Sequence, residues 1–258
     1  MIFADEQDLR EFRFRQNSTG TGPASNAEHP VIGITRKSAR PRALRARRPK
    51  SKLAQVQVRR FEIAGAFEFT PKSFPDDRGL FVAPFQEETF TEATGHPLRV
   101  AQTNHSVSAG NVIRGVHFAD VPPGQAKYVY CPSGVLLDIV IDVRVGSPTF
   151  GQWEPVRLDS SEYRAVYLAE GLGHAFVALT DDTVMAYLCS TPYNPSAEHG
   201  INPLDPELAL PWDKHLSGVP VLSDKDRHAP SLREAADAGT LPDYEACLAH
   251  YERLRLEP

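Results

Sequence analysis

From Phe61 onward, short runs rich in Val, Ile, Phe and Tyr recur about every ten residues, with turn-forming residues between them. Turn signals include Asp-Asp-Arg-Gly at 76–79 and Pro-Pro-Gly at 122–124. Short strands at this spacing are typical of a β-sandwich, jelly roll or barrel, and they argue against alternating βαβ units. The predicted strands cover residues 61–70, 80–86, 99–107, 111–119, 127–132, 135–144, 154–158, 164–169, 174–179 and 183–190.

Helical patterns are confined to short segments. Residues 87–94 (EETFTEAT) predict a short helix, and residues 231–254 predict two helices broken near Gly239 and Pro242. The apolar run 135–143 contains two aspartates, which alternation between the two faces of a strand would explain. We therefore expect an all-β domain over residues 58–258 with short C-terminal helices.

The N-terminal residues have a different composition. Residues 1–60 contain 14 Lys and Arg against 5 Asp and Glu, whereas the rest of the chain contains 14 against 28. Residues 16–30 are rich in Ser, Thr, Gly, Asn and Pro and offer little to bury. We expect residues 1–57 to form a disordered basic extension, either a solvated tail or a stretch upstream of the true start. A basic arm can contact nucleic acid, but no aromatic residue is interleaved with the basic cluster at 36–60, so we expect no nucleic-acid partner.

Several classes of protein do not fit this sequence. No run of 18 apolar residues is present, so we expect no membrane span, and no apolar segment near the start suggests a secretion signal. The three cysteines, Cys131, Cys189 and Cys247, are odd in number and far apart. This pattern favours free thiols in the reducing cytoplasm over a disulfide framework.

Polar side chains inside the predicted strands indicate a lined cavity, because barrel strands that carry inward polar groups usually surround a ligand. Buried Arg and Lys are costly unless they are paired, and an anionic ligand would supply the pairing. The residues that carry this pattern are Gln102, Asn104, Arg114, His117, Lys127, His174 and Tyr187.

The segments Gly115-Val116-His117 and 170–174 (EGLGH) have some similarity to metal cupins, which supply two histidines and a glutamate in the first motif. The second histidine and the glutamate are missing after His117, where Phe118, Ala119 and Asp120 follow. Too few ligands remain for a transition metal, so we expect no metal site.

A series of short motifs follows in order along about 190 residues: DRGLF (77–81), QTNHS (102–106), VIRGVHF (112–118), QAK (125–127), DVR (142–144), SPTFG (147–151), EGLGHAF (170–176) and LSDKD (222–226). This series resembles the dTDP-4-dehydrorhamnose 3,5-epimerase family. The resemblance implies a cupin-like jelly-roll barrel, a homodimer, and no metal or other cofactor. The stretches 117–131 and 188–193 look most like the branch from actinomycete antibiotic pathways, which includes 3-, 5- and 3,5-epimerases. The implied partner is a TDP-linked 4-keto-6-deoxy sugar.

The resemblance also implies roles for individual residues. His117 matches the catalytic base, Asp226 the carboxylate that orients it, Tyr187 the opposing acid, and Lys127 the group near the ketone oxygen. The substrate-binding positions are matched by Arg78, Gln102, Asn104, Arg114, His174, Glu198 and Lys225. One departure is Ala83, where many relatives carry a carboxylate, so the accepted sugar and the inverted carbon stay open.

These residue types suit the chemistry. Inverting a carbon next to a ketone requires a base, a cation at the developing enolate oxygen, and a proton donor on the opposite face. Tyr193 lies near Tyr187 in sequence and is a second candidate for the donor. Two other functions stay open: a ketoisomerase acting on related TDP-keto sugars, and a non-catalytic sugar-nucleotide-binding regulator that uses the basic extension.

Overall fold

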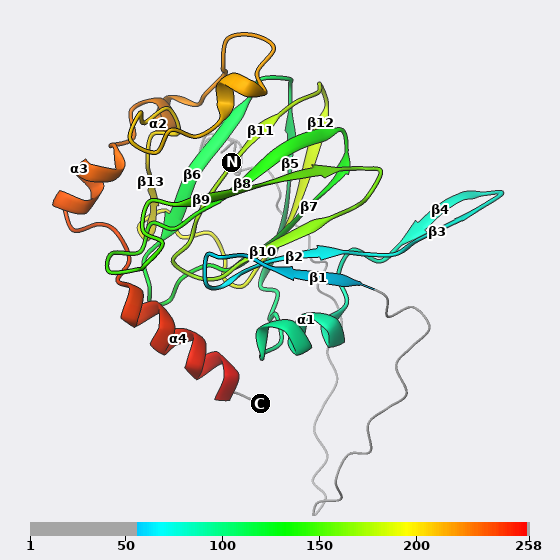
Figure 1. The fold of residues 1–258 in the computed structure, drawn as a ribbon, viewed down its shortest axis with the longest axis horizontal. Helices are drawn as coiled ribbons and strands as arrows, with labels where there is room; N and C mark the ends of the chain where they lie inside the picture. The colour runs from blue at the N-terminus through cyan, green and yellow to red at the C-terminus, as the bar shows by residue number, and fades with distance from the viewer. Residues whose placement is uncertain (1–55, 257–258) are drawn as a thin grey trace, which may run out of the picture. The chain divides into compact units, whose positions relative to one another are not determined.

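The computed structural model describes residues 56–256, in which two β-sheets face each other (Figure 1). The larger sheet has six antiparallel strands in the order β1-β2-β10-β7-β12-β5. In chain order they are β1 (Gln57–Arg60), β2 (Ala66–Thr70), β5 (Gln102–Ser108), β7 (Lys127–Ser133), β10 (Ala165–Leu168) and β12 (Thr183–Cys189).

The smaller sheet has five antiparallel strands in the order β13-β6-β11-β8-β9. From β5 to β13 the chain alternates between the two sheets, except at the β8–β9 hairpin, and this path is that of a jelly roll. The predicted fold class is therefore confirmed. The strands are β6 (Ile113–Ala119), β8 (Val135–Ile141), β9 (Trp153–Asp159), β11 (Gly173–Ala178) and β13 (Glu198–Gly200).

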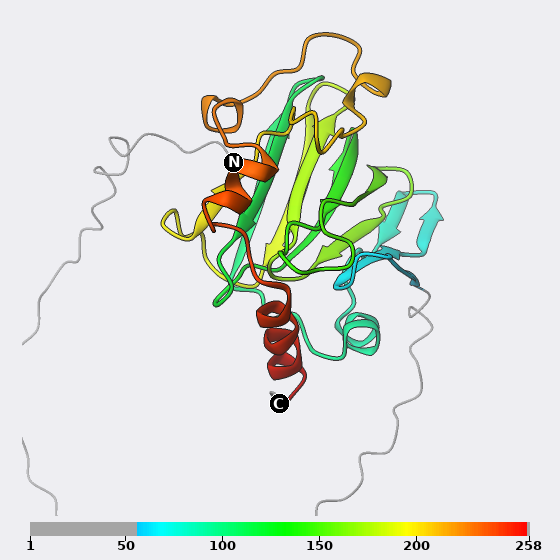
Figure 2. The ribbon, with the colours of Figure 1, turned by 60° about the vertical axis from the view of Figure 1, so that its left-hand side comes forward.

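Apolar side chains form three layers. The central layer lies between the sheets, since it contains Val129 and Val166 from the larger sheet together with Val140 and Phe176 from the smaller. The outer face of the smaller sheet is covered by the C-terminal segment, in which Trp212 is one of the buried residues (Figure 2). The outer face of the larger sheet packs against two helices, α1 (Glu87–Thr94) and α4 (Tyr244–Leu256). Both faces of each sheet are thus covered by apolar side chains, and this packing holds the strands in place.

Four short α-helices surround this core. They are α1 (Glu87–Thr94), α2 (Asp224–Arg227), α3 (Leu232–Asp237) and α4 (Tyr244–Leu256), and a 3₁₀ turn covers Trp212–Lys214. Helix α1 ends at Gly95, whose φ of 89° suits glycine and whose N–H donates to Thr91 O. Helix α3 begins with a capping box formed by Ser231 and Glu234.

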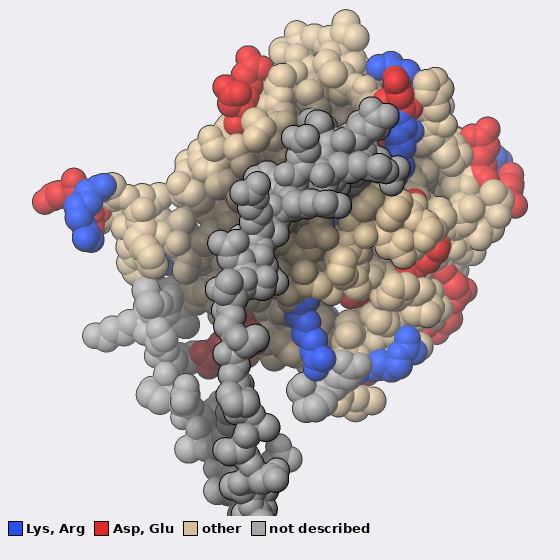
Figure 3. All heavy atoms as spheres, turned by 180° about the vertical axis from the view of Figure 1, so that it is seen from behind, with Lys and Arg blue, Asp and Glu red and all other residues tan. Residues whose placement is uncertain are grey.

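A two-stranded hairpin projects from the body of the domain (Figure 1). It consists of β3 (Ser73–Asp76) and β4 (Gly79–Val82). Seen from the opposite side, acidic and basic side chains gather at its tip (Figure 3), where the turn residues Asp77 and Arg78 lie. Phe81 and Leu80 are 58% and 45% exposed. Two large apolar side chains of β4 are therefore open to solvent beside the charged tip.

The predicted elements agree closely with the structure, and the differences have local causes. Helix 87–94 is found at its predicted bounds. The predicted strand 61–70 is wrong in its first half, because Phe61 N–H donates to Ala66 O and Gly65 adopts a φ of 94°, which closes a turn. Strand β1 begins at Gln57, the last residue of the predicted extension, and the rest of that extension up to residue 55 lies outside the described residues.

The two aspartates in the predicted strand 135–144 are not on a solvated face. Asp138 and Asp142 are both fully buried. Asp142 accepts hydrogen bonds from Nε and Nη2 of Arg144 at 2.8 and 2.7 Å, which forms a buried ion pair. Alternation accounts for Asp138, which shares one face of β8 with Leu136 and Val140, the face toward the other sheet. It does not account for Asp142, which follows the last residue of β8 and pairs with Arg144 instead.

Candidate active site

A histidine–aspartate pair joins β6 to helix α2. His117 Nε2 lies 2.7 Å from Asp226 Oδ1, although 109 residues separate them in sequence. Asp226 is held at the start of α2 because its backbone N–H donates to the side chain of Ser223, which caps that helix. A bridge between Val112 and Val221 brings the segment before α2 alongside β6. The fold therefore supplies a carboxylate on one ring nitrogen of His117.

The electrostatics of this pair favour a neutral imidazole beside a carboxylate. Burial lowers the pKa of His117 to about 4, against the rise that the hydrogen bond with Asp226 would cause. Burial would raise the pKa of Asp226, but the bonds with His117 and Ser223 hold it below its usual value. An ionised carboxylate only accepts hydrogen bonds, so Nε2 carries the imidazole proton. Nδ1 is then the nitrogen that can accept a proton.

A second histidine–aspartate pair lies on the neighbouring strand. His174 of β11 is the direct cross-strand partner of His117, so the two side chains share one face of the sheet. His174 Nε2 lies 2.6 Å from Asp138 Oδ1 of β8. Asp138 Oδ2 is buried and has no hydrogen-bond partner among the described residues. This pair explains the buried aspartate and places His174 beside the first pair.

Tyr187 faces this histidine from the opposite sheet. Its ring meets the His174 ring edge-on, with 6.3 Å between the centroids. Its hydroxyl lies 3.2 Å from Ser106 Oγ on β5. Burial raises the pKa of Tyr187 above its ordinary value, so the side chain is a phenol at neutral pH and can donate a proton.

Lys127, at the start of β7, supplies a cation to the same interior. Its cross-strand partner is Cys189, two residues after Tyr187 on β12. Burial lowers the pKa of Lys127, and the charge of Glu198 opposes this. The charge of Lys127 in turn lowers the pKa of His117, so the two groups lie within electrostatic reach.

Strand β5 carries the amide side chains of the site. Gln102 Nε2 donates to Asn104 Oδ1 at 2.7 Å, and Gln102 Oε1 accepts from the backbone N–H of Tyr193 at 3.0 Å. Arg114 of β6 is held against the same strand, where its Nε donates to Ser108 Oγ at 3.1 Å. The two amides and the guanidinium are thus fixed by neighbouring strands before any ligand binds.

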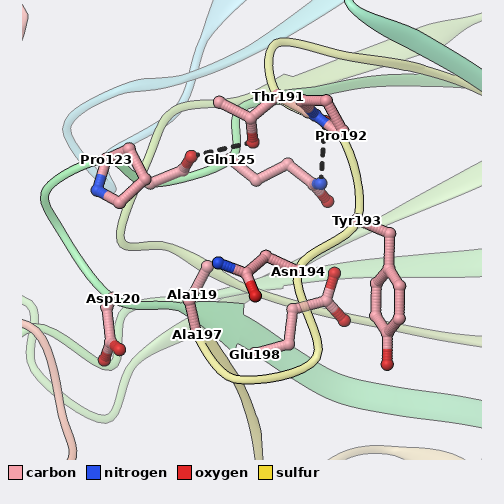
Figure 4. Close-up of a pocket in the computed structure, with 11 residues that line it drawn as sticks. Ala119, Asp120, Pro123, Gln125, Thr191, Pro192, Tyr193, Asn194, Ala197 and Glu198 are labelled. Carbon is pink, nitrogen blue, oxygen red and sulfur yellow. Dashed lines mark hydrogen bonds between the residues drawn. The ribbon is translucent and has the colours of Figure 1, made fainter.

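A pocket of about 320 Å³ opens between the loop after β6 and the loop after β12 (Figure 4). Glu198, Gln125 and Tyr193 line it, together with Thr191 and Asp120. Two buried acceptor atoms, Gln125 Oε1 and Glu198 Oε1, have no hydrogen-bond partner among the described residues. Buried acceptors are normally satisfied, so this pocket suits a ligand that donates hydrogen bonds.

Two of the predicted binding residues lie apart from the others. Lys225 is exposed on α2, next to Asp226, and its charge lowers the pKa of Lys127, so it lies at the margin of the site. Arg78 lies at the tip of the β3–β4 hairpin, where its side chain is 90% exposed and pairs with Asp76. Within one chain, therefore, Arg78 does not join the groups between the sheets.

Sequence reasoning missed four residues that the structure brings to the site: Ser106, Ser108, Gln125 and Asp138. Alternation could have found the two serines, because they continue the spacing of Gln102 and Asn104 along the same strand. Asp138 was visible as a carboxylate in an apolar run, but only the fold reveals its histidine partner.

Over residues 56–256, no group of three or more His, Cys, Asp and Glu side chains is arranged to hold a metal ion. In the same part of the chain, no helix is both long enough and apolar enough to span a bilayer. Fold and site together define the class: a jelly-roll protein with histidine, tyrosine and lysine side chains, all able to exchange protons, in the space between its sheets.

Known proteins of this class match the chain closely. The family model for dTDP-4-dehydrorhamnose 3,5-epimerase matches residues 60–234. A dTDP-4-dehydrorhamnose 3,5-epimerase from Mycolicibacterium smegmatis is 52% identical over 200 residues, 78% of this chain and 98% of that protein. NovW, a 4-keto-6-deoxy sugar epimerase from the novobiocin cluster of Streptomyces spheroides, is 51% identical with a TM-score of 0.73, covering 75% of this chain and 96% of its own. ChmJ, a 3′-monoepimerase from Streptomyces bikiniensis solved with dTDP-quinovose, is 47% identical with a TM-score of 0.74. The match covers 76% of this chain and 98% of ChmJ.

The chain belongs to the dTDP-4-dehydrorhamnose 3,5-epimerase family, a family of nucleotide-sugar epimerases. The predicted family is therefore confirmed, and the similarity to NovW agrees with the expected likeness to antibiotic-pathway members. The alternative of a regulator depends on the basic extension, which lies outside the described residues except for its last two positions.

Proposed function

We propose that this enzyme inverts C3, C5 or both in a dTDP-4-keto-6-deoxyhexose by removing and returning a proton beside the ketone. The observation that carries the proposal is the buried His117–Asp226 pair, with a neutral imidazole in the same interior as Tyr187 and Lys127. Similar proteins act at different carbons: ChmJ is a 3′-monoepimerase and the M. smegmatis protein a 3,5-epimerase. The pathway we infer is deoxysugar biosynthesis, in line with the NovW cluster.

The nucleotide end of the substrate fits the pocket beside the site. A thymine ring has one N–H donor, and Glu198 Oε1 and Gln125 Oε1 are buried acceptors without a partner among the described residues. The ring of Tyr193 lies at the edge of this pocket (Figure 4) and offers an aromatic face. Arg114 and Lys225 supply positive charge for the diphosphate, since Arg binds phosphate bidentately and Lys acts as a point charge.

The sugar then lies between the sheets, with its ketone at Lys127. Nδ1 of His117 removes the proton from the carbon beside the ketone, and the electrons of that C–H bond form an enolate. The imidazolium that results is stabilised by the carboxylate of Asp226. The ammonium of Lys127 stabilises the charge on the enolate oxygen, a contribution that is often the largest in such reactions.

Inversion requires that a proton returns to the other face of the same carbon. Tyr187 stands on the sheet opposite His117 and is protonated at neutral pH. Its O–H bond breaks as the new C–H bond forms, and the electron pair stays on the phenolate oxygen. Exchange with water then returns a proton to the phenolate and removes one from the imidazolium, which restores both groups.

We further propose that a second copy of the chain completes the site. The side chain of Arg78 is 90% exposed and lies away from the other predicted binding residues of its own chain. It lies on a projecting hairpin that has two exposed apolar residues, Leu80 and Phe81. If that hairpin packs on a partner, it buries the apolar residues and delivers the guanidinium to the partner's diphosphate site. The enzyme would then be a homodimer. Its buried free thiols also fit the cytoplasm, where we place it.

Proton NMR of dTDP-4-keto-6-deoxyglucose with the purified protein in D₂O tests the activity. Loss of both the C3 and C5 proton signals identifies a 3,5-epimerase, and loss of one identifies a mono-epimerase. If both signals persist while dTDP binds, epimerisation of this sugar is ruled out. If both persist and dTDP does not bind, the assignment of the pocket is wrong as well.

A further inference from the structure

The inward face of β5 is a row of four polar side chains. Gln102, Asn104, Ser106 and Ser108 are half-buried or buried, and they alternate with the exposed residues Thr103, His105 and Val107. Each of the four contacts a different part of the site. The amides hold each other and the Tyr193 backbone, Ser106 holds Tyr187, and Ser108 holds Arg114. The two serines have no assigned role in the reaction described above.

Ser106 is placed to act on the proton donor. Its Oγ lies 3.2 Å from the hydroxyl of Tyr187, on the adjacent strand β12. The edge-on contact with His174 limits how the Tyr187 ring can turn, but it leaves the O–H free to rotate. Either hydroxyl can donate in this hydrogen bond; with Ser106 as the donor, the phenolic proton is directed away from β5 and toward the space between the sheets.

The same bond also affects how readily the proton leaves. Burial raises the pKa of Tyr187, whereas the hydrogen bond with Ser106 and the charge of Arg114 both lower it. A donor aimed at an oxygen stabilises the negative charge that develops there as the proton is transferred. Tyr187 is half-buried, so a phenolate there is less well solvated than an exposed one, and a hydrogen-bond donor stabilises its charge.

We propose that Ser106 is the positioning residue for Tyr187, orienting the phenol toward the substrate and stabilising the phenolate left after proton return. This inference rests on the proposed function. It concerns how the enolate divides between two fates: protonation by Tyr187 gives the epimer, whereas protonation by the His117 imidazolium regenerates the original sugar. In D₂O the second fate appears as deuterium exchange without inversion, once the imidazolium has exchanged the removed proton for a deuteron from the solvent.

The ratio of exchange to inversion therefore reports on Ser106 specifically. It is measured by NMR in D₂O for wild type, Ser106→Ala, Ser106→Thr and Thr103→Ala, with dTDP-4-keto-6-deoxyglucose. Losing one hydrogen bond to a group that becomes charged should raise the ratio in Ser106→Ala about tenfold. Ser106→Thr keeps the hydroxyl and restores the wild-type ratio. Thr103→Ala removes a hydroxyl from the outward face of the same strand and leaves the ratio unchanged.

The outcomes separate this inference from the proposed function. A wild-type protein that neither exchanges nor inverts overturns the proposed function, and this inference with it. A wild-type protein that does both, with the same ratio in Ser106→Ala, overturns the role of Ser106 alone. A parallel fall of exchange and inversion in Ser106→Ala also overturns it, because that indicates general damage to the site. If Ser106→Ala does not fold, Ser106→Cys, with a weaker donor, must give a raised ratio.

Discussion

Two histidine–aspartate pairs lie on adjacent strands of one sheet, and they differ in how they are enclosed. The His117 side chain is 19% exposed, and its carboxylate comes from helix α2, outside the sheet. The His174 side chain is 5% exposed, and its carboxylate comes from β8, within the sheet. The hydrogen bonds are nearly equal in length, at 2.7 and 2.6 Å. The exposed fraction of the histidine, and not the length of the hydrogen bond, therefore distinguishes the two pairs, and we propose that the more exposed pair moves the proton.

The largest expected effect is that of removing the proposed base. His117→Ala should lower kcat by about 10²–10⁴-fold, the usual contribution of a positioned acid–base group. The protein should stay folded and bind dTDP, since the imidazole belongs to the more open pair; NMR turnover and calorimetric dTDP titration measure these. His174→Ala is the matched control, with a smaller loss of kcat. An equal or greater loss of kcat in the control would reverse the roles of the two pairs.

The second largest effect is expected from neutralising Asp226, the carboxylate of the more exposed His117–Asp226 pair, called the open pair below. In Asp226→Asn the amide can donate to Nε2, which would move the imidazole proton to Nδ1 and block the nitrogen that must accept a proton. We expect kcat to fall about 10²–10⁴-fold with little change in dTDP affinity. The less exposed His174–Asp138 pair, called the closed pair below, supplies the comparison through Asp138→Asn. Near-normal turnover by Asp226→Asn would show that the carboxylate does not set the tautomer.

A pH profile tests the state of His117 in the free enzyme. The base must be neutral, so kcat/KM falls as the pH drops through the pKa of His117. Because burial lowers that pKa to about 4, kcat/KM should stay level from pH 7.5 through 6.5 and decline only in more acidic buffers. The profile is measured from initial rates in buffers where the enzyme remains folded. A decline centred at or above pH 6.5 would contradict the buried, neutral imidazole.

The smallest effect concerns stability and falls on the closed pair. Asp138→Ala removes the partner of a buried imidazole nitrogen, so the free energy of unfolding should fall by about 1–3 kcal/mol. Asp226→Ala should lower the free energy of unfolding by a smaller amount, because its partner His117 is more exposed to solvent. Urea unfolding of both variants gives the comparison. A larger stability loss for Asp226→Ala would mean that the open pair is the structural one.

Most of the fold could be predicted from the sequence because each strand carries its own pattern. Strands β5 to β12 all overlap predicted runs, and α1 matches at both ends. The short strands β1, β3 and β13 were missed because their three or four residues (QVRR, SFPD and EHG) include few apolar ones, unlike the equally short β10 (AVYL). Of the three, β13 alone pairs with a strand distant in sequence, β6, whereas β1 and β3 form hairpins with β2 and β4.

The candidate site was predictable where its residues lie on strands. His117, Lys127, His174 and Tyr187 stood out as polar residues in apolar runs, and the structure brings them between the sheets. Asp226 could be found only through the family resemblance, because no local pattern reveals a contact across 109 residues. The place of Arg78 depends on a hairpin that leaves the body of its own chain, which no local pattern indicates.

The central claim is that His117 removes the proton and Tyr187 returns it from the opposite side. The most direct test follows deuterium incorporation and inversion together, in D₂O, for His117→Ala and Tyr187→Phe on dTDP-4-keto-6-deoxyglucose. We predict that His117→Ala neither exchanges nor inverts, whereas Tyr187→Phe still exchanges the proton beside the ketone without inverting the carbon. Exchange at the wild-type rate by His117→Ala, or normal inversion by Tyr187→Phe, would contradict the account.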